Sequence, residues 1–164
     1  MEFSENTRAL LKKAGWKEGR SVSAEKHLSV LTQEGYAVCE RVRAFLSRYA
    51  GIVITYKMNG GKSEGSLLSI DPQNEALGVW PTWPKCFSKV VGEKLCLIGT
   101  AHNMDMALFM GETGKIYIGG EFNLFFAGNT AEEAIDAICT DAKMREVPVD
   151  SSLTECSWFK GDAP

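Results

Sequence analysis

Residues 94–128 read KLCLIGTAHNMDMALFMGETGKIYIGGEFNLFFAG, and this stretch decides the fold. Its short runs of apolar, β-branched and aromatic residues predict four strands, over 94–101, 105–110, 115–118 and 123–127. Gly111-Glu112-Thr113-Gly114 separates the second run from the third and is typical of a hairpin turn. The stretch therefore predicts a mostly antiparallel sheet.

Two further strands are expected upstream of this stretch. Ile52-Val53-Ile54-Thr55-Tyr56-Lys57 is rich in β-branched and aromatic residues, and a return strand over 66–70 follows the turn signal Asn59-Gly60-Gly61. Asp71-Pro72 ends the return strand. The next residues, 73–91, contain Pro81 and Pro84 and show no clear pattern, so they are predicted to form a long ordered loop.

Helices are expected on both sides of the sheet segments. Three precede them, over 5–14, from an N-cap at Ser23 to Gly35, and over 38–50 up to Gly51. A capping box of Thr130 and Glu133 begins the last helix, which is predicted to run to about residue 144. The fold class is α+β: N-terminal helices, a mostly antiparallel twisted sheet of about six strands, and a C-terminal helix packed on the sheet. Residues 1–145 form a single domain, and 146–164 form a tail for which loose attachment is one interpretation.

The charge is unevenly distributed along the chain. The 164 residues have a net charge of −3, but residues 1–50 carry nine Lys or Arg against six Asp or Glu, and residues 111–164 carry four against ten. A nucleic-acid binder would need a concentrated basic surface, so this function is not expected. The acidic last third is either a solvated helix and tail or a surface that attracts a basic partner.

Targeting, cofactor and metal signals are weak. No apolar run approaches the roughly 20 residues that span a bilayer, and the N-terminus does not resemble a signal peptide, so a cytoplasmic location without membrane association is expected. The five cysteines, at positions 39, 86, 96, 139 and 156, are odd in number and lack a CxxC pair. They are predicted to be buried free thiols, with neither a metal site nor a cofactor.

One motif imitates a catalytic site. Gly61-Lys62-Ser63-Glu64-Gly65 fits the letters of a nucleophile elbow, and Asp71 and His102 follow in the order that α/β-hydrolases use. The elbow requires a strand entering a helix, whereas here strands are expected on both sides, so a polar hairpin tip is the better interpretation. His27 and His102 lack a companion at a local spacing and are interpreted as structural or surface residues. The sequence therefore indicates a binding protein rather than an enzyme.

Tryptophans and glycines mark the remaining positions of interest. In Gly15-Trp16-x-x-Gly19-Arg20 the glycines allow a sharp connection, the indole is expected to pack below it, and Arg20 is expected to pair with a carboxylate or a carbonyl. Trp80 and Trp83 either hold the proline-rich connection against the core or anchor a partner.

The order of several short motifs resembles the SUKH superfamily, and within it the third group of SUKH immunity proteins. The resemblance covers most of residues 7–139 and begins with Ala9-Leu10-Leu11-x-x-Ala14-Gly15-Trp16-x-x-Gly19-Arg20. It continues through Glu34-Gly35-Tyr36, Phe45-Leu46-x-x-Tyr49-Ala50-Gly51, Ile70-Asp71-Pro72, Leu97-Ile98-Gly99, Gly114-Lys115-Ile116-Tyr117 and Gly128-Asn129-Thr130-x-x-Glu133-Ala134-Ile135.

The resemblance implies a non-catalytic bacterial antitoxin that binds a cognate toxin domain, often a nuclease or a deaminase, and blocks it stoichiometrically. An acidic surface would suit the basic residues of a nuclease. The hypothesis for that surface comprises Glu112, Glu121, Glu132, Glu133 and Asp136, with Trp80 and Trp83 as anchors. Two alternatives stay open: a regulatory or scaffold module that binds a host protein, and a small hydrolase or transferase that uses Ser63 or His102.

Overall fold

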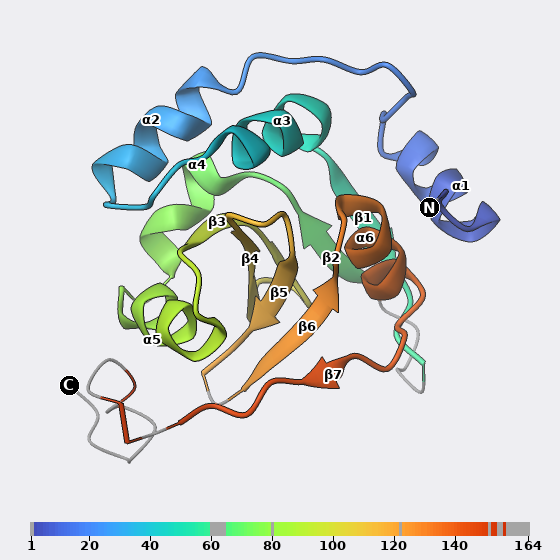
Figure 1. Cartoon of the computed structure of the whole chain (residues 1–164). Coiled ribbons are helices and arrows are strands. Elements are labelled where there is room, and N and C mark those ends of the chain that lie inside the picture. Colours follow the sequence, from blue (N-terminus) through green and yellow to red (C-terminus); the bar gives the residue numbers. More distant parts are fainter. Residues whose placement is uncertain are drawn as a thin grey trace.

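The fold is built on one antiparallel sheet with the strands in sequence order, from β1 at one edge to β7 at the other (Figure 1). The computed structural model describes residues 2–59, 65–79, 81–121, 123–150, 152, 153 and 156. The strands are β1 (Val53–Tyr56), β2 (Ser66–Ser69), β3 (Leu95–Ala101), β4 (Met106–Gly111), β5 (Ile116–Gly119), β6 (Leu124–Gly128) and β7 (Arg145–Glu146). The α+β class and the antiparallel sheet predicted from the sequence are confirmed.

Helices pack around this sheet (Figure 1). They are α1 (Glu5–Lys13), α2 (Glu25–Gln33), α3 (Glu40–Tyr49), α4 (Pro72–Glu75), the 3-10 turn η1 (Ala76–Gly78), α5 (Thr82–Val91) and α6 (Ala131–Cys139). Helix α6 packs on β6. Helices α4 and α5 both pack on β3, and α1 contacts α6 and β1. The first and the last helix of the fold, α1 and α6, therefore contact each other and share one hydrophobic core.

The central strands are buried on both faces. Every residue of β3 is buried, and so are five of the six residues of β4. This explains why residues 94–111 read as nearly continuous apolar runs instead of an alternating pattern. Gly99 lies at a shift in the β3–β4 register, and a Cβ there would come within 2.3 Å of the Ser69 carbonyl oxygen. Only glycine allows β2 and β3 to approach so closely.

Helices α1 and α2 end in the same way. Gly15 and Gly35 follow them with φ of +87° and +84°, in the left-handed region that favours glycine. The next residue then turns back, so that the Trp16 N–H donates to the Leu11 carbonyl and the Tyr36 N–H donates to the Leu31 carbonyl, each at 2.9 Å. Each turn therefore places an aromatic side chain at the end of its helix, Trp16 after α1 and Tyr36 after α2.

The segment after α1 is fixed to α3. The Trp16 ring stacks on Tyr49, with ring centroids 5.9 Å apart and planes 9° apart. Arg20 donates to the carbonyls of Arg48 and Ala50, at 2.9 and 2.8 Å. The sequence predicted either a carboxylate or a carbonyl as the partner of Arg20, and in the structure the partners are carbonyls. They belong to the end of α3, where a cation also suits the helix dipole.

The prediction of a long loop over residues 73–91 was wrong. These residues form most of α4, then η1 and the whole of α5. The prolines misled the prediction because Pro81 is the N-cap of α5 and Pro84 lies in its first turn, where a backbone N–H has no intrahelical partner anyway. Behind Pro84, Cys86 and Phe87 are fully buried on the inner side of α5.

Several helix boundaries also differ from the predictions, and α3, predicted over 38–50, is Glu40–Tyr49. The N-cap of α2 is Ala24 rather than Ser23. Helix α6 ends at Cys139 instead of about residue 144, because Asp141 takes a left-handed φ of +49° and the Ala142 N–H returns to the Ala137 carbonyl. Aspartate tolerates this conformation better than most residues, so it can end a helix without glycine.

The C-terminal segment returns to the sheet. Strand β7 pairs with β6, which gives seven strands where about six were predicted, and Cys156 forms a disulfide bond with Cys86 of α5. The prediction of five free thiols was therefore wrong for this pair, while Cys39, Cys96 and Cys139 are free. Within the described residues, no helix has the length and apolar character needed to cross a bilayer.

Candidate partner-binding groove

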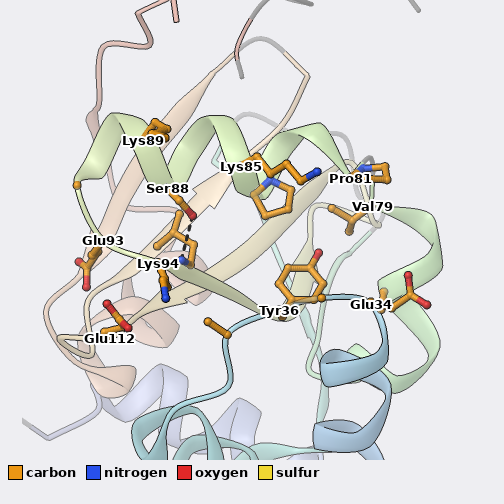
Figure 2. Close-up of a pocket in the computed structure, with 16 residues that line it drawn as sticks. Glu34, Tyr36, Val79, Pro81, Lys85, Ser88, Lys89, Glu93, Lys94 and Glu112 are labelled. Carbon is orange, nitrogen blue, oxygen red and sulfur yellow. Dashed lines mark hydrogen bonds between the residues drawn. The ribbon is translucent and has the colours of Figure 1, made fainter. Parts of the chain in front are cut away.

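An open groove of about 900 Å³ lies between the end of α2 and one side of α5 (Figure 2). Much of its apolar lining comes from the segment between α4 and α5, from the first turn of α5 and from the start of β3: Ala76, Val79, Pro81, Pro84 and Leu95. The volume is at the upper end of the range for ligand pockets, about 300–1,000 Å³. A groove of this size and openness suits a segment of another molecule.

Two hydroxyl groups face the groove from opposite sides. Tyr36 stands in it because the turn after α2 reverses the chain, and Figure 2 shows its hydroxyl directed toward the side of α5. On α5, Ser88 Oγ accepts a hydrogen bond from the Leu95 N–H at 3.0 Å, which keeps the Ser88 proton available for donation. Burial, followed by the charges of Cys96 and Glu34, raises the pKa of Tyr36 above its ordinary value of 10.0. A phenol is already a hydrogen-bond donor at neutral pH without this shift.

Charged side chains surround these hydroxyls. Lys85 extends from α5 over the groove, and Lys94 lies at the start of β3 (Figure 2). Glu93 is held by the fold, since its carboxylate accepts from the Thr113 N–H at 2.9 Å and from the Tyr117 hydroxyl at 3.3 Å. No three His, Cys, Asp or Glu within the described part of the chain gather as metal ligands.

The predicted partner-binding residues are spread over several elements. Trp80 lies outside the described residues. Trp83 is on α5, half-buried against the core, with its ring 6.5 Å from that of Phe87. Glu112, in the turn between β4 and β5, lines the groove, whereas Glu121 follows β5 at the opposite end of that strand. Glu112 and Glu121 are both exposed.

The three α6 carboxylates have intramolecular partners. Asp136 Oδ1 accepts from the Ser4 N–H at 2.9 Å and from the Ser4 hydroxyl at 2.6 Å. Glu133 accepts from the Asn129 N–H at 2.8 Å, and Glu132 lies 3.2 Å from an Arg48 nitrogen. Their first role in the fold is to hold α6 to α1, to its own N-terminus and to α3.

The residues that imitated a hydrolase have other neighbours. Ser63 lies outside the described residues, and the flanking strands β1 and β2 pair with each other, so a strand follows the motif instead of a helix. His102 Nδ1 lies 2.8 Å from the Tyr56 hydroxyl, and His27 Nδ1 lies 3.7 Å from Asp71. Burial lowers the pKa of both histidines, against the attraction of nearby aspartates.

Sequence reasoning missed most of the groove. Tyr36 was named only within the Glu34-Gly35-Tyr36 motif, and residues 81–88 were assigned to a loop. The spacing of Pro81, Pro84, Lys85 and Ser88 by three or four residues is the signal that indicates one face of a helix.

The fold is an α+β domain with an open groove lined by both apolar and charged side chains. A family model described as SUKH-3 immunity protein matches residues 3–141. The chain belongs to the SUKH-3 immunity protein family, and the match takes in α1 through α6. No curated protein and no solved structure matches the chain.

Proposed function

We propose that this protein is an antitoxin that binds a cognate bacterial toxin domain, a nuclease or a deaminase, and neutralises it by stoichiometric binding. The observation that carries the proposal is the family match over residues 3–141, which spans the helices and the first six strands. The open groove supports it, because such a surface accommodates part of a protein partner.

Charge gives a second, physical support. Residues 111–164 carry ten acidic against four basic side chains, and a nuclease needs basic residues around its phosphate substrate. Glu112 and Glu121 are exposed and contribute to that attraction directly. Glu132, Glu133 and Asp136 contribute charge from side chains that are already bonded within the fold, and Trp80 and Trp83 complete the proposed contacts.

Co-expression with the protein encoded directly beside this gene tests the proposal. If that protein is the cognate toxin, it stops growth when expressed alone, and co-expression of this chain restores growth and gives a complex of equal stoichiometry. Nucleic-acid cleavage or release of ammonia by the purified toxin distinguishes a nuclease from a deaminase, and either activity should disappear when one equivalent of this chain is added. Well-expressed chain that neither restores growth nor forms a complex would contradict the proposal.

The acidic contacts are tested by charge reversal. We expect Glu112→Lys with Glu121→Lys to slow association with a nuclease toxin about tenfold at low salt, with a smaller effect at high salt. Glu2→Lys with Glu18→Lys, two exposed positions before and after α1, is the charge-matched control. Equal association rates for the double variant and the control would contradict the acidic contribution.

A further inference from the structure

The middle of the groove presents hydrogen-bond donors without acceptors to match. Tyr36 and Lys85 approach the same space from the turn after α2 and from α5, and Ser88 lies one helical turn after Lys85 (Figure 2). Among the described residues, none forms a hydrogen bond with the Tyr36 hydroxyl or an ion pair with Lys85. A half-buried phenol and an ammonium group are therefore poised for a ligand that accepts hydrogen bonds.

The acidic groups of the groove lie outside this centre, although the charge of Glu34 reaches Tyr36 and raises its pKa. Glu93 is bonded to Thr113 and Tyr117, and Glu34 and Glu112 stand at the two ends of the groove in Figure 2. Donors thus occupy the middle, and carboxylates occupy the ends. An acidic side chain would fit the middle, while a basic side chain there would face Lys85 and lack an acceptor.

We propose that the groove binds a short segment of the toxin with an acidic side chain, whose carboxylate lies between Tyr36 Oη and Lys85 Nζ. This inference rests on the proposed function and adds to it the surface and the chemistry of the partner. The residues beside the acidic one pack on Val79, Pro81 and Pro84, which supply the apolar surface of a binding pocket. A charge-assisted bond to the phenol and an ion pair to the lysine fix the orientation of the segment.

Selection from a random library of displayed 12-residue peptides against the full chain tests the groove without the toxin. The enriched peptides are expected to share an Asp or Glu beside apolar residues. Lys85→Glu should then weaken their binding more than tenfold, and Tyr36→Phe about tenfold, measured by fluorescence anisotropy. Lys17→Glu, an exposed position outside the groove, is the charge-matched control and should not change the affinity. Peptides with the acidic residue replaced by Lys should bind the Lys85→Glu variant better than the unmodified chain.

Three outcomes would overturn the proposal: no enriched peptide, enriched peptides without an acidic residue, or equal binding to the chain and to its Lys85→Glu variant. Equal thermal unfolding temperatures of the variants show that the fold is intact. Growth protection separates this inference from the proposed function. If Lys85→Glu protects cells as well as the unmodified chain does, the groove does not bind the toxin as proposed, and the antitoxin function stands. If the unmodified chain gives no protection, the antitoxin function fails whatever the peptides show.

Discussion

Cys86 of α5 and Cys156 are joined by a disulfide bond although 70 residues separate them in the sequence. The bond attaches the C-terminal segment to the helix that forms one wall of the groove. It closes a loop that contains the strands from β3 to β7 and helix α6. A crosslink over so long a loop removes much of the conformational freedom of the unfolded chain.

Loss of this bond should lower stability. Cys156→Ser is expected to reduce the free energy of unfolding by about 2–4 kcal/mol, the usual contribution of a native disulfide. Urea unfolding followed by circular dichroism measures this, and a reducing agent should bring the unmodified chain to the same midpoint. Cys39→Ser, at a free and partly exposed cysteine, is the matched control. A Cys156→Ser variant as stable as this control would show that the bond contributes nothing in solution.

The contribution of Trp16 to the stability of the fold should come from its aromatic ring, which stacks on Tyr49, and not from the indole N–H. Trp16 Nε1 is buried and has no hydrogen-bond partner among the described residues. Trp16→Ala is expected to cost about 2–3 kcal/mol, since it removes the stacking on Tyr49 and the edge contact with Phe3. Trp16→Phe retains an aromatic ring and should cost about 1 kcal/mol or less. Chemical unfolding compares the two, and equal losses would refute the role of the ring.

The link between α1 and α6 through Asp136 should weaken in acid. Burial alone would raise the pKa of Asp136, but hydrogen bonds from Ser4 and Thr7 lower it below its ordinary value of 3.8. The carboxylate therefore contributes stability above that value, and the contribution is lost as the pH falls through the lowered pKa. Asp136→Ala should cost about 1–2 kcal/mol at pH 7. Thermal unfolding from pH 7 to pH 2.5 should show this difference decreasing toward the acid end; a constant difference would contradict the assignment.

Glu75 should have the opposite dependence on pH. Its side chain is buried, Oε1 accepts from the Thr100 hydroxyl at 3.1 Å, and Oε2 has no partner among the described residues. Burial raises the pKa above 4.5, although hydrogen bonds from Ser69 and Thr100 oppose it. Because the folded chain favours the protonated form of Glu75, this group contributes most to stability below pH 4.5. The contribution is lost as the pH rises through the raised pKa. Glu75→Gln should gain stability relative to the unmodified chain between pH 4 and pH 7, measured by urea unfolding at both values.

Local signals predicted most of the sheet and the N-terminal helices. Strands β3 to β6 follow from β-branched and aromatic runs separated by short turns, and the end of α2 follows from Gly35. These features depend on neighbours within a few residues, so the sequence contains the necessary information. Helix α5 was missed because proline is accepted both in loops and in the first turn of a helix, so its presence alone does not distinguish the two.

The groove and the disulfide could not be predicted in the same way. Tyr36, Lys85 and Glu112 come from three distant segments, and only the packing of α2, α5 and the β4–β5 turn brings them to one surface. The pairing of Cys86 with Cys156 depends likewise on the path of the chain after α6. Spacing along a sequence does not determine which of several cysteines pair.

Strand β7 has a consequence for self-association of the chain. Its two residues, Arg145 and Glu146, pair with Phe126 and Phe125 at the outer side of β6, and the Arg145 guanidinium lies 5.2 Å from the Phe126 ring centre. Removing the chain from residue 145 onward would leave β6, with two half-buried phenylalanines, as the last strand. Unpaired N–H and C=O groups beside apolar side chains are a template for stacking between copies. We therefore expect the short, charged strand at this border to oppose pairing between the sheets of two copies.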